Sequence, residues 1–376
     1  MNPGAAIRSY SLNSMRSEAP TPGQRAWRIV LTMAAAGYRT GVAVRAWTFA
    51  SGLRGVRRLP CPVICVGNLT VGGSGKTPCT IALAQWFQAR GRYPGILLRG
   101  YGRHGSGVTV AADARADHAR WEAVGDEAML LARHLPGVPV VVGANRFQAG
   151  MEALRRFRLD VLLLDDGFQH RQLHRDLDLA MVDATDPFGG GRLLPRGRLR
   201  EPVSSLGRAH AIILSRSDQA SDLPGLRRCL ERIAPGVVQI LTRHRPSRLT
   251  ELEGGEERPL SSLQGRRLLA VSGIANPAAF HRTLTALGGV VAGAAAFPDH
   301  HPYAPADLSQ VARAAHEVRA ELVVTTEKDA VRMPVAPTPE AASAPPIRVL
   351  EVELEVTEGT DSLERLLMGC GGGTRG

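Results

Sequence analysis

Short, predominantly apolar runs recur through the middle of the chain. Strands that are buried on both faces of a parallel sheet read in this way, whereas half-exposed strands alternate between apolar and polar residues. Stretches long enough for a helix separate most of the runs, which predicts an α/β fold with a mostly parallel sheet and helices on both faces. The expected strands are residues 63–66, 96–98, 138–142, 161–164, 177–182 and 211–215.

The first run leads into a glycine-rich turn. Residues 63–78 read as a buried strand, a turn, and a helix that starts at Lys76 and Thr77. This is the layout of a phosphate-binding P-loop, in which glycine lets backbone N–H groups approach phosphate oxygens and the helix N-terminus adds a favourable field. Lys76 would reach the outer phosphates, and the Thr77 hydroxyl would hold Mg²⁺. The alternative is a glycine-rich turn that binds no ligand.

This loop departs from the general P-loop pattern at one position. Thr70 stands where the strict pattern has a glycine, six residues before the lysine. We expect positive φ angles at Gly72, Gly73 and Gly75. The expected nucleotide-binding residues are Thr70, Val71, Gly72, Gly73, Ser74, Gly75, Lys76 and Thr77.

The apolar run at residues 161–164 ends in two aspartates, Asp165 and Asp166. A P-loop needs a carboxylate at the carboxyl edge of a neighbouring strand to organise Mg²⁺. We therefore expect Asp165 to share the ion with Thr77, with Glu201 as a further ligand. The alternative for Asp165 is an aspartate that caps the helix after the strand.

Two further loops combine arginine with glycine. Residues 99–103 follow the second apolar run, and residues 192–202 carry four arginines. Anionic ligands bind at the carboxyl ends of strands in open α/β sheets, which favours an anion-binding role for the first loop. For residues 192–202, composition leaves a phosphate-facing loop and a solvated basic turn equally open.

Composition adds the expectation of an acidic ligand. The chain has 376 residues and a formal net charge of +11, and Lys76 and Lys328 are its only lysines. Such a charge suits phosphate, nucleic acid or an anionic membrane. The five cysteines form no CxxC pair and no metal-ligand spacing, which fits a reducing compartment. Few aromatic residues and no recognisable nucleic-acid-binding module argue against nucleic acid.

The segment at residues 25–58 has an apolar helical surface with two tryptophans. Seven arginines and no acidic residue lie between Arg25 and Arg58, and no uncharged span of 20 residues occurs. These features favour an amphipathic helix that lies on an anionic membrane. The alternative is an amphipathic helix packed on the protein.

Eight motifs together resemble the tetraacyldisaccharide 4'-kinase family, whose pattern includes a threonine at the position of Thr70. The resemblance implies a P-loop kinase that uses ATP and Mg²⁺ to phosphorylate the 4'-hydroxyl of a lipid A disaccharide precursor, tetraacyldisaccharide 1-phosphate, to lipid IVA. It also implies a location on the cytoplasmic face of the Gram-negative inner membrane. The motifs are residues 67–78, 99–103, 125–127, 165–170, 199–202, 273–277, 299–300 and 326–329.

A sugar hydroxyl needs a general base within hydrogen-bond reach. Sequence pattern alone leaves Asp126, Asp166 and Asp183 open for this role. The family resemblance implies Asp126, oriented or assisted by His300 from the C-terminal domain. We expect the neighbouring His301 to be solvent-exposed or structural. Asp126 is expected just before a helix that starts at Ala128. The expected substrate contacts are Arg99, Tyr101, Arg146, Gln169, His170 and Arg198.

The chain is expected to form four segments, of which residues 244–266 are a polar connection between the two α/β domains. These segments are a disordered extension (1–24), a membrane-associated helix (25–58), a P-loop kinase core (59–245) and a smaller C-terminal α/β domain (246–376). The glycine-rich tail from Gly369 is expected to be frayed. We expect a monomer, although the sequence does not specify the oligomeric state.

Two alternatives of other classes are a GTPase or metallochaperone-type nucleotide switch and a lipid-binding module without catalysis. A guanine-specific loop would read Asn-Lys-x-Asp, whereas Lys328 and Asp329 are adjacent here. The lipid-binding alternative leaves the P-loop and Asp165 without a role.

Overall fold

The computed structural model describes residues 21–371, apart from residues 102, 104, 106, 112–120, 253–255, 275 and 335–344. The expected disordered extension therefore lies outside the described residues as far as residue 20. The chain forms two compact units, each built from separate segments. Unit 1 comprises Met1–Lys76, Asp166–Thr242 and Val356–Gly376, and unit 2 comprises Thr77–Asp165 and Arg243–Glu355. The four-segment domain division stays a prediction.

Unit 1 contains a parallel sheet with the strand order β8 (Val238–Glu251), β7 (Ala211–Ser215), β6 (Leu177–Asp183) and β1 (Val63–Asn68). The last three strands are almost wholly buried, whereas β8 is partly buried and belongs to this unit only as far as Thr242. Helix α7 (Leu223–Ile233) packs on it through Leu226 and Leu230, in a cluster with Ile212 and Leu214. The other helices are α2 (Pro22–Ala50), α12 (Thr360–Gly371) and the 3₁₀ helices η1 (Val203–Arg208) and η2 (Ser217–Gln219).

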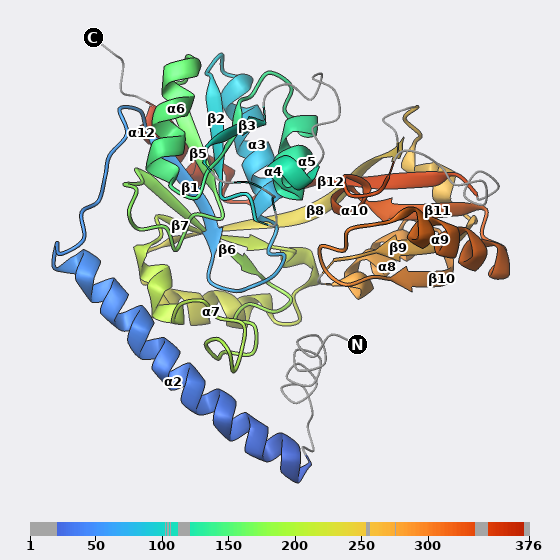
Figure 1. Ribbon diagram of the computed structural model, residues 1–376, viewed down its shortest axis with the longest axis horizontal. Helices are drawn as coiled ribbons and strands as arrows, with labels where there is room; N and C mark the ends of the chain where they lie inside the picture. Colours follow the sequence, from blue (N-terminus) through green and yellow to red (C-terminus); the bar gives the residue numbers. More distant parts are fainter. Residues whose placement is uncertain are drawn as a thin grey trace. The chain divides into compact units, whose positions relative to one another are not determined.

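Unit 2 contains two groups of strands (Figure 1). The first group has the order β5 (Val161–Asp165), β2 (Pro94–Leu98), β4 (Val140–Val142) and β3 (Thr109–Ala111), with only β3 antiparallel. Its helices are α3 (Lys76–Gln88), α4 (Trp121–Val124), α5 (Asp126–His134) and α6 (Arg146–Arg156). The continuous apolar runs thus form parallel strands, as the sequence predicts.

In the second group of strands, alternate residues of one strand face different helices. Its order is β10 (Val290–Ala296), β9 (Arg267–Ser272), β11 (Leu322–Thr326) and β12 (Ile347–Glu358). In β9, Leu268 packs with α8 (Pro277–Ala286), whereas Leu269 packs with α9 (Pro305–Glu317). This alternation places helices on both faces of the sheet. The remaining helices are α10 (Glu327–Ala330) and the 3₁₀ helix η3 (Leu260–Leu263).

The expected connection at residues 244–266 is wrong in its first part, because β8 continues to Glu251. Its arginines pair with glutamates of β12, the neighbouring strand. The pairs are Arg243 with Glu355, Arg245 with Glu353 and Arg248 with Glu351. Such cross-strand pairs of opposite charge let a polar segment form a strand, although it reads as a loop when taken alone.

The ends of the two terminal helices also differ from expectation. Helix α2 begins at Pro22, because Thr21 and Gln24 form a capping box, and it ends at Ala50, before residue 58. Helix α12 continues to Gly371 instead of fraying from Gly369. Its Leu367 is buried, and this packing compensates for the poor helix propensity of the glycines.

Helix α2 exposes many of its apolar side chains. Leu31 is buried, whereas Ile29, Met33 and Trp47 are each more than 60% exposed. Its Tyr38 hydroxyl donates to the carbonyl of Arg200 at 3.0 Å, and Arg45 donates to the carbonyl of Gln169 at the same distance. No helix within the described residues is long and apolar enough to cross a membrane.

Candidate active site

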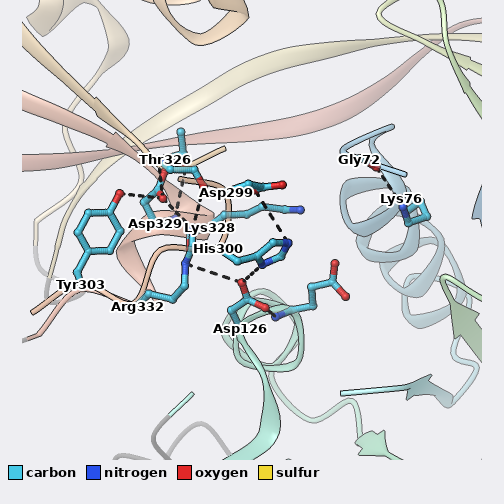
Figure 2. Close-up of polar contacts among 12 residues, drawn as sticks. Gly72, Lys76, Asp126, Asp299, His300, Tyr303, Thr326, Lys328, Asp329 and Arg332 are labelled. Atoms are coloured by element: carbon cyan, nitrogen blue, oxygen red, sulfur yellow. Dashed lines mark hydrogen bonds and ion pairs between the residues drawn. The ribbon is translucent and has the colours of Figure 1, made fainter. Parts of the chain in front are cut away.

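The glycine-rich loop leaves β1 and ends at Lys76, the first residue of α3. Gly72 and Gly75 have φ angles of 120° and 83°, which side chains other than glycine rarely adopt, so the loop requires glycine at both positions. The expectation of a positive φ at Gly73 is wrong. The Lys76 ammonium donates to Asn68 Oδ1 at 3.3 Å. It also donates to the Gly72 carbonyl at 3.5 Å (Figure 2).

Hydrogen bonds with other segments of unit 1 support this loop. The N–H of Val71 donates to the carbonyl of Arg198 at 2.8 Å, and the Ser215 hydroxyl donates to the carbonyl of Ser74 at 3.0 Å. Asn68 Nδ2 lies 3.2 Å from the Thr70 hydroxyl. Thr70 therefore contributes a hydroxyl to the loop, which a glycine could not do.

Asp166 and Asp183, two of the three candidates for the general base, are paired with arginines. Asp166 accepts two hydrogen bonds from Arg200, at 3.0 and 2.7 Å, and lies 3.8 Å from the Lys76 ammonium. Asp183 accepts from Arg216 and from Thr185. Their carboxylates thus bind cations and organise loops of unit 1.

Thr77 and Asp165 both belong to unit 2. Thr77 is in the first turn of α3, Asp165 is the last residue of β5, and both are buried. Burial raises the pKa of the Cys79 thiol, in the same turn as Thr77, and the negative charge of Asp165 raises it further. A hydroxyl and a carboxylate next to this turn are hard oxygen donors of the kind that Mg²⁺ prefers.

Glu201, the third expected metal ligand, is engaged by two arginines. Its Oε2 accepts from Arg208 at 2.6 Å and from Arg171 at 3.1 Å. Burial would raise the pKa of Glu201, but these two cations outweigh it and hold the pKa below its ordinary value. The Arg208 guanidinium also lies over the Phe168 ring, 4.4 Å from its centroid. Through these contacts Glu201 holds the loop at residues 192–202 in place. Metal ligation by Glu201 stays a prediction.

Asp126 is the first residue of α5, so the expected helix start at Ala128 is wrong. The preceding Gly125 has a φ of 95°, and a Cβ there would lie 3.3 Å from the Tyr101 carbonyl oxygen. Asp126 Oδ1 accepts from the N–H of Glu127 at 2.9 Å, and Oδ2 lies 2.7 Å from His300 Nδ1. The carboxylate thus accepts a hydrogen bond at the helix N-terminus and also binds a histidine far away in sequence.

The charges around Asp126 favour its ionised form. Burial alone would raise the pKa of Asp126, but the His300 hydrogen bond and the positive charges of His300, Arg332 and Lys328 lower it. The hydrogen bond to Asp126 in turn raises the pKa of His300, although burial opposes this change. Because an ionised carboxylate can only accept, Nδ1 is the protonated nitrogen of His300 in this contact.

His301 differs from His300 in its surroundings. Its ring stacks on Phe297 at a centroid distance of 4.8 Å and meets Tyr303 edge-on at 5.0 Å. Its Nε2 lies 2.9 Å from Asp307 Oδ2 at the start of α9. These contacts are those of a packed, structural histidine.

The expected substrate contacts of unit 2 differ in exposure. Tyr101 is 72% exposed, and its ring centroid lies 6.2 Å from that of His300. Arg99 is exposed, whereas Arg146 is buried at the start of α6 and donates to the carbonyl of Ala144 at 3.0 Å. Of these three residues, the structure brings Tyr101 next to the Asp126–His300 pair.

The expected substrate contacts of unit 1 are Gln169, His170 and Arg198. Gln169 Nε2 donates to the carbonyl of Asn68 at 2.9 Å. Arg198 forms an ion pair with Asp186, and the carbonyl of His170 accepts from Arg175. Gln169 therefore adjoins the strand end that precedes the glycine-rich loop.

Sequence reasoning did not select Asn68, Arg200 and Arg332 as site residues. Asn68 and Arg200 lie within two of the family motifs, residues 67–78 and 199–202, and Arg200 donates to Asn68 Oδ1 as well as to Asp166. Arg332 Nε lies 3.8 Å from Asp126 Oδ2. The motif at residues 326–329 stops short of it, so no sequence signal marked Arg332.

The first strand of a parallel sheet leads into a glycine-rich loop, and Lys-Thr stands at the start of the next helix. This arrangement defines a P-loop nucleotide-binding protein. A family model described as "Tetraacyldisaccharide-1-P 4'-kinase" matches residues 27–369. The chain therefore belongs to this kinase family, which confirms the resemblance and selects it over the nucleotide-switch alternative.

Relatives and a solved structure agree with this assignment. The chain is 45% identical over 339 residues to "Tetraacyldisaccharide 4'-kinase" of Anaeromyxobacter sp. (strain K), covering 90% of this chain and 89% of the relative. It is 39% identical over 342 residues to the protein of that name from Syntrophus aciditrophicus (strain SB), covering 88% and 90%. The crystal structure of LpxK from Aquifex aeolicus in complex with ATP matches with a TM-score of 0.73 and 29% identity, over 92% of this chain and 99% of that chain. The predicted fold class is thereby confirmed.

Proposed function

We infer that this protein is an ATP-dependent kinase that phosphorylates the 4'-hydroxyl of a tetraacyldisaccharide 1-phosphate in lipid A biosynthesis. The observation that carries this inference is the family match over residues 27–369, because it spans the P-loop, Asp126 and His300 together. The names of the relatives supply the acceptor, and the ATP in the Aquifex aeolicus structure supplies the donor. The product would be lipid IVA.

Phosphoryl transfer depends on positioning and charge stabilisation, with little covalent chemistry for the protein to do. The amides of the glycine-rich loop and the Lys76 ammonium would bind the ATP phosphates. Lys76 carries three donor hydrogens, of which the Asn68 and Gly72 oxygens use two in the contacts above. The phosphates would replace these neutral acceptors with charged ones, which bind an ammonium more strongly.

The nucleotide site would also hold Mg²⁺, through Thr77 and Asp165. The support is the chemistry of the two donors, a buried hydroxyl and a buried carboxylate whose charge acts on Cys79 in the same turn as Thr77. The bound ion would neutralise negative charge on the phosphate oxygens. Glu201 is proposed as a further ligand, in competition with its bonds to Arg171 and Arg208.

Asp126 is proposed to accept the proton of the attacking 4'-hydroxyl. Its support is the 2.7 Å contact with His300, which fixes one carboxylate oxygen, and the lowered pKa, which keeps the group ionised. A base must be within hydrogen-bond reach and unprotonated before its substrate loses the proton. The Nδ1–H of His300 would stabilise this carboxylate and orient it.

The 1-phosphate and sugar of the acceptor require cationic and polar partners. The proposed contacts are Arg99, Tyr101, Arg146, Gln169, His170 and Arg198. Tyr101 is the best supported, because its exposed ring lies beside His300. An aromatic ring of this kind can stack on the apolar face of a sugar.

We further propose that α2 lies on an anionic membrane at the cytoplasmic face of the inner membrane, where the acyl chains of the acceptor reside. The support is the set of exposed apolar side chains on α2, together with seven arginines between Arg25 and Arg58 and no acidic residue among them. Such a helix would hold the enzyme beside an acceptor that does not leave the lipid phase.

The function is tested by supplying purified protein with radiolabelled ATP, Mg²⁺ and tetraacyldisaccharide 1-phosphate in detergent micelles, and separating the lipids by thin-layer chromatography. We expect one new, more polar phospholipid. Lys76→Ala and Thr77→Ala should lower its formation by about 10²–10³-fold or more, because each removes a group that binds the transferring phosphate or its ion.

The control for both variants is Arg155→Ala, which removes an exposed arginine on α6 and should retain the activity of the unaltered protein. Thermal unfolding should show that all three variants remain folded. Turnover by Lys76→Ala at the unaltered rate would contradict the assignment of the P-loop, and no labelled lipid from the unaltered protein would contradict the function.

A further inference from the structure

Asp329 is a completely buried carboxylate in the C-terminal strand group of unit 2. Its Oδ1 accepts from the N–H of Gly273 at 2.9 Å and the Tyr303 hydroxyl at 3.0 Å, and its Oδ2 accepts from the Thr326 hydroxyl at 2.6 Å. A buried carboxylate with this many partners is held in one position. Asp329 is therefore a fixed anchor for a cation.

The cation that it binds is Arg332, which is 2% exposed. Arg332 Nη2 donates to Asp329 Oδ1 at 2.7 Å, and Nε donates to the carbonyl of Lys328 at 2.9 Å. The same Nε lies 3.8 Å from Asp126 Oδ2, the oxygen that contacts His300 (Figure 2). A single guanidinium thus joins the anchor to the pair that is proposed to activate the substrate.

We propose that Arg332 is a positioning residue for the Asp126–His300 pair, and that it holds a fixed positive charge against the carboxylate. This inference rests on the proposed function, in which Asp126 receives the proton of the 4'-hydroxyl. An ordinary buried ion pair would need only Asp329 and Arg332. Arg332 Nε donates its hydrogen to the Lys328 carbonyl and also lies 3.8 Å from Asp126 Oδ2, which adds a charge contact that the pair with Asp329 does not require.

The charged groups that face the pair determine the direction of the pH effect. Asp126 is faced by His300, Arg332 and Lys328, and His300 is faced by Asp126, Asp299 and Lys328. Asp126 and His300 titrate as a coupled pair, since they share a hydrogen bond. A guanidinium remains charged throughout the accessible pH range, so Arg332 favours release of a proton from the pair at every pH. Removing the Arg332 side chain should therefore make the pair retain its proton to higher pH.

The test is the pH dependence of kcat for the full-length protein with ATP and tetraacyldisaccharide 1-phosphate. We expect Arg332→Met to move the acidic limb of the profile upward by about 1 pH unit, because an opposite charge at this distance typically shifts a pKa by about 1–3 units. The plateau kcat should fall about tenfold, since misplacement of a catalytic group has effects of this order or larger. The KM for ATP should stay within about twofold, because Arg332 is not proposed to bind ATP.

Three further variants separate positioning from folding. Arg332→Gln is a smaller neutral change that retains an amide donor, and it should move the acidic limb in the same direction as Arg332→Met. Arg332→Lys keeps the positive charge, so its acidic limb should lie where that of the unaltered protein lies. Arg348→Met removes an arginine that pairs with Glu251 elsewhere in unit 2, and its profile should match that of the unaltered protein.

Folded Arg332→Met or Arg332→Gln protein with an unmoved acidic limb would overturn the inference, and so would an equal shift in Arg348→Met. Failure of both neutral variants to fold would overturn it as well, since Arg332 would then be a structural residue. If the unaltered protein makes no product in the same assay, the proposed function fails. An active unaltered protein whose variants show no shift refutes only the role of Arg332.

Discussion

Asp126 combines two roles that are usually separate in a protein. An aspartate at the first position of a helix is favoured by the helix dipole and often does no more than stabilise the helix. Here one oxygen binds the N–H of Glu127, and the other contacts His300. The two oxygens therefore give a substitution two distinct consequences, one for the helix and one for the histidine.

Replacing Asp126 separates these consequences. Asp126→Asn should retain the local helix N-terminus, because asparagine is an equally good acceptor there, yet kcat should fall by about 10²–10⁴-fold because an amide cannot take up a proton. His300→Ala should also lower kcat, and the double variant should lose far less than the product of the two single losses, because both belong to one proton-accepting unit. Measuring kcat and ATP affinity for the two single variants and the double variant checks this.

Two controls accompany these measurements. Asp222→Asn changes an aspartate that caps α7 and contacts no proposed catalytic group, and His316→Ala removes an exposed histidine on α9. Both should leave kcat unchanged. Losses from Asp126→Asn and His300→Ala that multiply in the double variant would place the two residues in separate steps.

At this scale, the sequence could point to residues whose proposed chemistry belongs to a local motif. Lys76 and Thr77 are proposed from the glycines around them, and Asp126 and His300 from the family motifs. Arg332 could not be identified in this way, because its role depends on Asp329 and Asp126 meeting it in the folded unit. The bonds of Asp166 to Arg200 likewise could not be predicted from the local sequence.

At the scale of the elements, helix α2 leaves several large apolar side chains exposed to solvent. Apolar side chains usually gain about 1.5–3 kcal/mol when they leave water, and Met33 and Trp47 remain largely exposed on this helix. Polar contacts of Tyr38 and Arg45 hold other parts of the helix to unit 1. A lipid surface would complete the burial of the exposed side chains.

Full-length protein with Met33→Gln and Trp47→Gln should bind anionic phospholipid vesicles at least about tenfold more weakly, because each change removes apolar area that enters the lipid. Binding of the unaltered protein should weaken as salt rises, since the arginines of this segment act through screened charge. Co-sedimentation with the vesicles measures both effects.

Met368→Gln is the control, because Met368 is a similarly exposed methionine on α12. It should leave vesicle binding unchanged. Equal binding by the Met33 and Trp47 double variant and the unaltered protein would favour a helix that is only packed on the protein.

Apolar runs predicted the central strands well because burial on both faces disfavours polar residues. The same criterion missed β8, whose Arg243, Arg245 and Arg248 are satisfied by glutamates of another strand. It also missed α12, whose glycines disfavour a helix in isolation. In both elements the stabilising partners lie far away in the sequence, so local pattern could not reveal them.

For the molecule as a whole, histidine pairs within unit 2 make stability depend on pH. His134 on α5 binds Glu327 on α10, and these two helices come from separate segments of the chain. Burial would lower the pKa of His134, but the hydrogen bond to Glu327 and the negative charge of Glu351 outweigh it and raise the pKa above its ordinary value of 6.5. The folded protein thus binds a proton at His134 more tightly than the unfolded chain does.

A raised histidine pKa contributes stability that is fully present below the unfolded pKa and is lost as pH rises through the folded pKa. The free energy of unfolding of His134→Gln should therefore fall further below that of the unaltered protein at pH 5.5 than at pH 8.5. Urea unfolding at the two pH values measures the difference. The exposed His316→Gln should show no such change, and a deficit that is equal at both pH values would exclude protonation as the cause.

The two units also differ in when their segments are made. Unit 1 uses residues from before and after both segments of unit 2, and its α12, with the buried Leu367, follows Glu355 in the sequence. A ribosome therefore synthesises every residue of unit 2 before the last segment of unit 1. Unit 2 thus has its complete sequence first, while β1 and the glycine-rich loop belong to a unit that still lacks a helix. The nucleotide-binding loop is thus among the first parts of the chain to emerge and among the last to reach its finished surroundings.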